Sequence, residues 1–109
     1  MMGFTADYAG VEATHAEIDA IAGPLLLEFG APWCPHCLRV QPILADLLGR
    51  FPDVQHTKIY DGKGKPLGRS FRVRLWPTLV FLRDGKVLHK AVRPSEGEIA
   101  EGLSAIMGE

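Results

Sequence analysis

Cysteine is scarce in this chain: only Cys34 and Cys37 are present, separated by two residues. A small scaffold stapled by disulfides needs several bridges, because its core is too small to hold the fold. This chain has 109 residues, of which 47% are apolar, so it can bury a core without metals or several disulfides. The sequence therefore excludes a stapled mini-protein and predicts a single domain over residues 1–109.

Excess charge of either sign is also missing, since 12 basic and 13 acidic side chains leave a net charge of −1. This balance gives no general attraction to nucleic acid or to an anionic membrane, so we expect neither as a partner. The distribution is nevertheless uneven. Five basic residues stand shortly before Trp76: Lys63, Lys65, Arg69, Arg72 and Arg74. They form either a solvated face or a rim that steers acidic partners.

Signals for export or membrane insertion are lacking as well. A secretory signal begins with positive side chains, and the first 38 residues contain no Lys or Arg. No segment approaches the roughly 18 apolar residues of a membrane-spanning helix. We therefore expect a cytoplasmic protein without membrane insertion, although a mature secreted form beginning at a new Met1 would look the same.

What the chain does contain is an alternation of helix and strand signals. Capping boxes at Thr14–Glu17 and Ser95–Glu98 predict the starts of the first and last helices, because their side chains satisfy free backbone N–H groups. Apolar runs and turn residues predict strands at Leu25–Phe29, Val54–Tyr60, Thr78–Arg83 and Lys86–Val92, and helices at Cys34–Leu48 and Leu67–Phe71. This order predicts an α/β fold in which a mixed sheet of about four strands lies between helices.

The cysteine pair has three possible roles. As a structural disulfide it would close a loop of only two intervening residues, which constrains the unfolded chain very little. As a zinc site it would need two further ligands beyond the cysteines, such as His36 with His56 or His89. As a redox pair it fits the predicted helix start, where free N–H groups and the helix dipole favour a thiolate at Cys34. Cys37, one turn further along, would then resolve a mixed disulfide.

Several separated features together resemble the thioredoxin family. They are Trp33-Cys34-X-X-Cys37 after a buried strand, Pro42 five residues beyond Cys37, and Trp76-Pro77-Thr78 before a hairpin with Asp84-Gly85 at its turn. The resemblance covers about residues 11–107 and implies a thioredoxin-like three-layer sandwich.

The resemblance also implies a role for each matching position. Cys34 attacks the substrate disulfide, and Cys37 releases the product. Pro77 is a cis-proline opposite the cysteines, and Trp76 before it offers backbone groups to a bound peptide. Trp33 packs beside the site. Glu28 stands where the family usually has a buried aspartate that accepts the proton of the second cysteine through water.

The residues themselves support a role for Glu28. A carboxylate on an otherwise apolar strand should be partly desolvated, which disfavours its charged form and suits it to proton transfer. The alternative is a side chain at the end of the strand that reaches solvent.

Two departures from the family pattern affect the expected chemistry. Ordinary thioredoxins have Gly-Pro between the cysteines, whereas Pro35-His36 resembles the disulfide-introducing oxidases of the bacterial periplasm. His36 could stabilise the Cys34 thiolate and make the disulfide more oxidising, or it could simply point to solvent. Around the cis-proline, Leu75, Trp76 and Arg93 replace smaller residues, so substrates should be selected differently, unless Trp76 folds inward.

One further position bears on the buried carboxylate. The thioredoxin family usually has a lysine near it, and the resemblance places Lys58 one residue away from that position; such a displacement would turn its side chain to the other face of the strand.

From these observations we expect a thiol-disulfide oxidoreductase that uses Cys34 and Cys37, with no metal or organic cofactor. Its partners would be protein disulfides or dithiols and a reductase or oxidase that recharges the pair, and we expect a monomer. A reducing cytoplasm favours work as a reductase. The alternatives are a more oxidising disulfide donor or isomerase, and a protein-binding module in which redox or zinc chemistry is secondary.

Overall fold

The computed structural model describes residues 3–108 and contains one sheet of four strands. The elements follow in the order α1 (His15–Asp19), β1 (Pro24–Gly30), α2 (Pro35–Gly49), β2 (Gln55–Tyr60), α3 (Pro66–Ser70), β3 (Thr78–Arg83), β4 (Lys86–Val92) and α4 (Glu96–Met107). The predicted elements are therefore all present, with ends that move by one or two residues. In this part of the chain no helix is long and apolar enough to cross a membrane.

The strands lie in the order β2-β1-β3-β4, with β1 and β2 parallel and the other neighbours antiparallel. A parallel pair needs a crossover, which α2 supplies, whereas β3 and β4 are joined by a tight turn. At that turn Asp84 and Gly85 both have positive φ, of 52° and 80°, as a two-residue hairpin turn requires. The predicted mixed sheet is confirmed.

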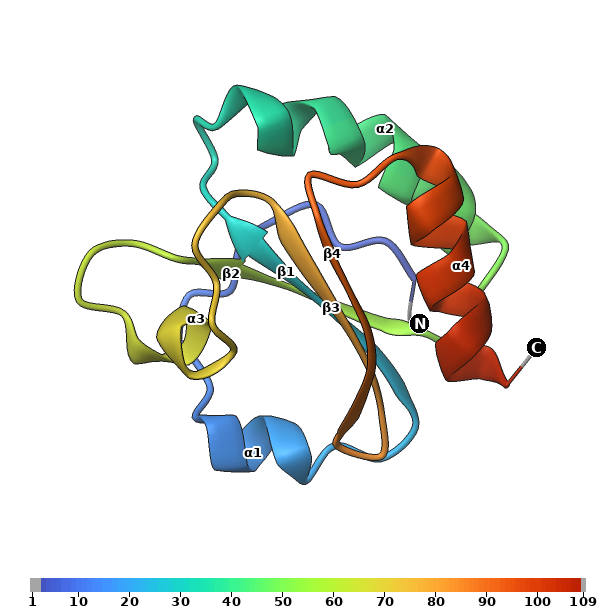
Figure 1. Cartoon of the computed structure of the whole chain (residues 1–109), viewed down its shortest axis with the longest axis horizontal. Helices are drawn as coiled ribbons and strands as arrows, with labels where there is room; N and C mark the ends of the chain where they lie inside the picture. The colour runs from blue at the N-terminus through green and yellow to red at the C-terminus, as the bar shows by residue number, and fades with distance from the viewer. Residues whose placement is uncertain (1–2, 109) are drawn as a thin grey trace.

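Helices cover both faces of the sheet and give the predicted three layers (Figure 1). Alternate side chains of β1 divide between two cores. Leu26 packs with α2 and α4, and Leu25, Leu27 and Phe29 pack with α1 and α3 on the opposite face. Glu28 has the same parity as Leu26, so this alternation directs it toward α2, the helix that carries the cysteines.

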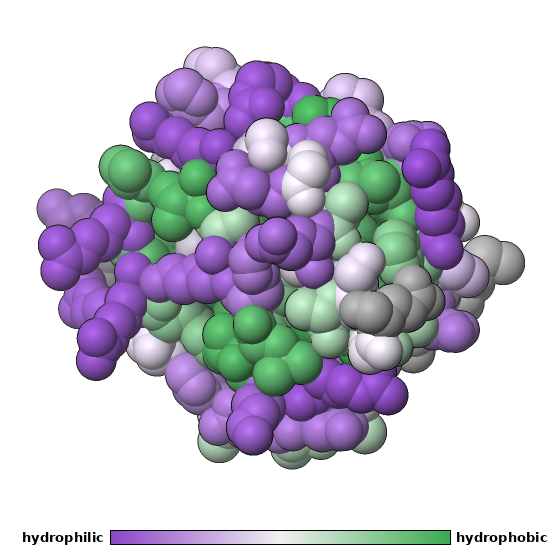
Figure 2. Space-filling view, turned by 45° about the vertical axis from the view of Figure 1, so that its right-hand side comes forward, coloured by the Kyte–Doolittle hydropathy of each residue, from purple (hydrophilic) through white to green (hydrophobic). Residues whose placement is uncertain are grey.

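The two edges of the sheet differ. A segment near the N-terminus runs beside β2 through isolated bridges at Gly3 and Tyr8. The β4 edge is open, and its exposed apolar residues, Val87, Leu88 and Val92, are interspersed with Lys86 and Lys90. Figure 2 shows the molecule turned so that the right-hand side of Figure 1 comes forward. On this face hydrophobic patches are separated by hydrophilic side chains.

Candidate active site

Cys34 stands at the start of α2 as its N-cap residue. Its backbone is extended, and its sulfur accepts a hydrogen bond from the Cys37 backbone N–H at 3.3 Å. Pro35 suits the first helical position, because proline lacks the N–H that would be unpaired there. The local sequence therefore places the Cys34 sulfur at the N-terminal end of a helix, within hydrogen-bonding distance of a backbone N–H group.

Cys37 lies one turn further into α2 and is only 1% exposed. Burial raises the pKa of its thiol from 9.0 to about 12, and the hydrogen bond to Cys34 and the charges of Cys34 and Glu28 add to the increase. Both cysteines are free thiols. Cys37 therefore remains protonated at neutral pH and must lose its proton before it can act as a nucleophile.

Glu28 is completely buried on β1, so the expectation of a desolvated carboxylate is confirmed and the solvent-exposed alternative is wrong. Its two oxygens are held by different elements. Oε1 lies 2.9 Å from Nε2 of His56 on β2, and Oε2 accepts a hydrogen bond of 2.7 Å from the Gln41 amide on α2. The same Gln41 amide nitrogen donates to the Cys37 carbonyl at 2.9 Å. Gln41 thus links the carboxylate to the turn of helix that carries Cys37.

Lys58 lies on the same face of the sheet as Glu28, and the apparent one-residue displacement is a wrong prediction. The parallel register pairs Glu28 directly with Lys58. The ammonium donates at 2.8 Å to the Gln41 side-chain oxygen and at 2.8 Å to the Ala6 carbonyl. Lys58 therefore faces Glu28 across Gln41, so the buried carboxylate has a nearby positive charge without a direct ion pair.

His36 is exposed to solvent at the start of α2. Within residues 3–108 no hydrogen bond joins its ring to Cys34; the donor to that sulfur is the Cys37 backbone. This geometry favours the solvent-facing alternative for His36.

The predicted binding residues Trp76, Pro77 and Arg93 form one linked group. Trp76 packs against the buried cluster of Ala31, Cys34 and Cys37, and its indole N–H donates to Asp61 at 3.0 Å. Its peptide bond to Pro77 is cis, as the resemblance implies. Arg93, with a φ of 48°, donates through Nε to the Trp76 carbonyl at 2.9 Å.

Trp33 stands immediately before Cys34 and is 63% exposed. It meets Tyr60 edge to face, with ring centroids 5.2 Å apart. An exposed aromatic ring beside the cysteine pair can offer an apolar contact to an incoming protein.

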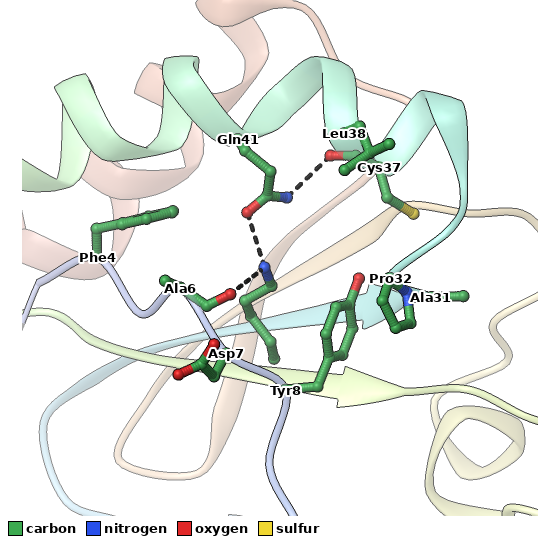
Figure 3. Close-up of a pocket in the computed structure, with 10 residues that line it drawn as sticks. Phe4, Ala6, Asp7, Tyr8, Ala31, Pro32, Cys37, Leu38 and Gln41 are labelled. Atoms are coloured by element: carbon green, nitrogen blue, oxygen red, sulfur yellow. Dashed lines mark hydrogen bonds between the residues drawn. The ribbon is translucent and has the colours of Figure 1, made fainter.

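A pocket of about 540 Å³ opens beside Cys37, between α2 and the segment that precedes α1 (Figure 3). Tyr8 points into it with its hydroxyl toward Cys37, and burial raises the pKa of this phenol above its usual value near 10. Gly30 makes this approach possible, since a Cβ there would lie 2.5 Å from the Cys37 sulfur and 3.3 Å from the Tyr8 hydroxyl.

No three His, Cys, Asp or Glu side chains come together as potential metal ligands between residues 3 and 108. His56 is occupied by Glu28 and Thr5, and the ring of His89 lies against Phe81. The zinc alternative for the cysteines therefore gains no support from the side chains around them.

Sequence reasoning missed Tyr8, Gln41 and the role of His56. Two of them carried a usable signal. Gln41 follows Cys37 by four residues and so lies on the same face of α2, and His56 precedes Lys58 by two residues and so shares its face of β2. Tyr8 gave no such signal, because only the path of the N-terminal segment brings it to Cys37.

Two thiols held in this way, one at the start of a helix and the other buried one turn further along, can exchange a disulfide with another protein. The fold and the site together define a thiol-disulfide oxidoreductase.

Comparison with known proteins gives the family. The Thioredoxin family model matches residues 9–107. The chain is 31% identical over 80 residues to Thioredoxin H1 of Arabidopsis thaliana, covering 73% of this chain and 70% of that protein. It is 44% identical to thioredoxin 2 from Pseudomonas aeruginosa PAO1, whose reduced form superposes with a TM-score of 0.85 over 96% of this chain and 98% of the other. The chain belongs to the thioredoxin family.

Proposed function

We propose that this protein reduces disulfides of partner proteins, with Cys34 as the nucleophile, Cys37 as the resolving thiol and Glu28 as the acceptor of the Cys37 proton. The observation that carries the proposal is the burial of both Cys37 and the Glu28 carboxylate, which Gln41 links through hydrogen bonds to the Cys37 carbonyl and to Glu28. A thiol with a pKa of about 12 is a poor nucleophile at neutral pH unless a base removes its proton during the reaction.

The reaction then has two exchange steps. In the first, the Cys34 thiolate attacks one sulfur of the substrate disulfide, forms a mixed disulfide and releases the other sulfur as a thiolate, which takes a proton. In the second, Cys37 gives its proton to Glu28 and attacks the Cys34 sulfur. The bond from Cys34 to the substrate breaks, the second substrate thiolate leaves, and the Cys34–Cys37 disulfide remains. Two electrons have passed to the substrate, and a partner reductase must supply two electrons to reduce the Cys34–Cys37 disulfide again.

The substrate surface in this proposal consists of Trp33, Trp76, Pro77 and Arg93. Trp33, next to Cys34 in the chain, and Trp76, packed against the cysteine cluster, offer apolar contact, and Arg93 adds a positive charge at the Trp76 carbonyl. A partner with an acidic segment beside its disulfide would suit this charge and the basic residues before Trp76. The protein would act on such partners as a monomeric, single-domain enzyme.

A reductase role fits a compartment that keeps thiols reduced, such as the cytoplasm. The exposed position of His36 supports this direction, because a histidine that does not touch the Cys34 sulfur adds little to the oxidising power of the pair. Equilibration with graded glutathione buffers measures the redox potential directly. We expect a value near that of ordinary thioredoxins, about −270 mV, and little change in His36→Pro. A value close to −120 mV would instead make the protein a disulfide donor.

The role of Glu28 is tested by Glu28→Gln in single-turnover reaction with 5,5′-dithiobis(2-nitrobenzoate). The first released thiolate reports attack by Cys34, and the second reports resolution by Cys37. We expect the second phase to slow by about 100-fold, the lower range for loss of a general base, while the first phase stays fast. A second phase equal to that of the wild-type protein would remove Glu28 from the mechanism.

The alternative of a binding module is tested by Cys34→Ser. If the variant loses both disulfide reduction and partner binding, the result fits the reductase. If the variant keeps full activity without Cys34, the result favours the binding module.

A further inference from the structure

His56 and Glu28 form a buried polar pair across β1 and β2 that the mechanism above does not use. Both side chains are completely buried, and Nε2 of His56 lies 2.9 Å from Oε1 of Glu28. We propose that His56 is a positioning residue that holds the Glu28 carboxylate for proton transfer from Cys37. The inference rests on the proposed role of Glu28.

The neighbours of His56 determine which ring nitrogen carries the proton. The Thr5 backbone N–H points at Nδ1 from 2.9 Å, and because an N–H group can only donate, Nδ1 must accept. The neutral ring therefore carries its proton on Nε2, the nitrogen that faces Glu28. The Thr5 hydroxyl also donates to the His56 carbonyl at 2.7 Å, so Thr5 fixes both the backbone and the ring.

This arrangement turns a flexible carboxylate into a fixed one. A glutamate has three rotatable side-chain bonds, and here each oxygen is held by one N–H donor, Oε1 by His56 and Oε2 by Gln41. Each oxygen keeps a further lone pair that can accept a proton. Without His56, Oε1 would lose its buried donor and the carboxylate would be anchored at one oxygen only.

The remaining charged and titratable groups near the pair act at other points. The Lys58 ammonium is taken by Gln41 and Ala6, and it lies 4.6 Å from the ring centre of Tyr8. Tyr8 and Cys37 lie together beside Gly30. In the described part of the chain, the only side chains that hydrogen-bond Glu28 are His56 and Gln41. His56 is thus placed to act on Glu28 rather than on either sulfur.

The test uses the two-phase reaction with 5,5′-dithiobis(2-nitrobenzoate). His56→Gln places an amide donor near the position of Nε2, whereas His56→Asn is too short to reach Glu28. We expect His56→Asn to slow the second phase about tenfold, the effect of one hydrogen bond to a charged group, with the first phase unchanged. His56→Gln should restore the second phase to within about twofold of the wild-type rate. His89→Asn, at a histidine whose ring meets Phe81 edge to face, is the matched control and should change neither phase.

A double variant separates positioning from a purely structural role. In the Glu28→Gln background, His56→Asn should leave the second phase almost unchanged, because the group that His56 positions no longer accepts a proton. Equal slowing by His56→Asn and His56→Gln, or the same slowing in both backgrounds, would overturn the inference. The inference would also be overturned if the second phase of His56→Asn proceeded at the wild-type rate. If Glu28→Gln alone leaves the second phase unchanged, it is the role of Glu28 that fails.

The wild-type protein offers a measurement that requires no variant to fold. ¹⁵N NMR of the histidine rings distinguishes a protonated nitrogen from an unprotonated one. We expect His56 to be neutral with its proton on Nε2, and a ring protonated at Nδ1 would overturn the inference.

Discussion

At the scale of single residues, the site depends on two cysteines in different surroundings. Cys34 caps a helix, whereas Cys37 is buried one turn further along. The proposed mechanism uses this difference and gives attack to the first sulfur and resolution to the second. The burial of Cys37 also makes the stability of the reduced protein depend on pH in the alkaline range.

The raised pKa of Cys37 predicts how stability depends on pH. In the unfolded chain the thiol ionises near pH 9.0, but in the folded protein it does so only near pH 12, chiefly because of burial. Between these values the folded state binds more protons than the unfolded state, so the free energy of unfolding falls as pH rises. Tyr8, whose pKa is also raised, acts in the same direction.

Urea unfolding of the reduced protein at intervals from pH 8 to pH 11 measures this effect. Cys37→Ala is the comparison variant, and its stability should fall less steeply because the contribution of the Cys37 thiol is removed. Identical slopes in the two proteins would show that Cys37 ionises alike in the folded and unfolded states.

Arg93 predicts a preference among substrates. Because its guanidinium lies beside the Trp76 carbonyl, Arg93→Glu should raise KM for a disulfide peptide with acidic flanking residues by about three- to tenfold. The kcat should remain unchanged, since the charge does not touch the reacting sulfurs. Arg50→Glu changes an exposed arginine at the end of α2 and should leave KM unaffected. Equal effects of the two substitutions would mean that only total charge matters.

At the scale of elements, the close packing of α4 on the sheet depends on a glycine. A Cβ at Gly102 would lie 2.6 Å from the ring of Phe81, which is completely buried on β3. Gly102→Ala must therefore displace either the ring or the helix, and we expect it to lower the free energy of unfolding by about 1–3 kcal/mol.

Gly49→Ala is the matched control, because Gly49 is exposed in the last turn of α2 with no atom within 4 Å of the added Cβ. It should raise the free energy of unfolding by up to about 1 kcal/mol through helix propensity. Chemical unfolding of both variants checks the pair, and a Gly102→Ala protein as stable as the wild type would mean that α4 shifts without cost.

At the scale of the whole molecule, the two cores share the central strand β1, so neither can form without it. We expect residues 1–109 to unfold as one cooperative unit. Trp33 and Trp76 both lie beside the cysteines, so their fluorescence reports that end of the molecule, whereas far-UV circular dichroism reports all the helices and strands. The two denaturation midpoints should coincide, and separated midpoints would indicate two independently folding parts.

The sequence by itself determined the elements, their order and the cysteine chemistry. Capping boxes, apolar runs and the Asp84-Gly85 turn are local signals, because they act within a few residues of the chain. The position of Cys34 before a helix was local in the same sense, and so was the apolar setting of Glu28.

Only the tertiary structure decided which side chains meet around Glu28 and Cys37. The register of β1 with β2 places Lys58 beside Glu28, and the path of the N-terminal segment brings Thr5 to His56 and Tyr8 to Cys37. These contacts join residues about 30 to 50 positions apart. Strand register and chain path result from packing over the whole domain, so no local pattern could reveal that a histidine on β2 holds a carboxylate on β1.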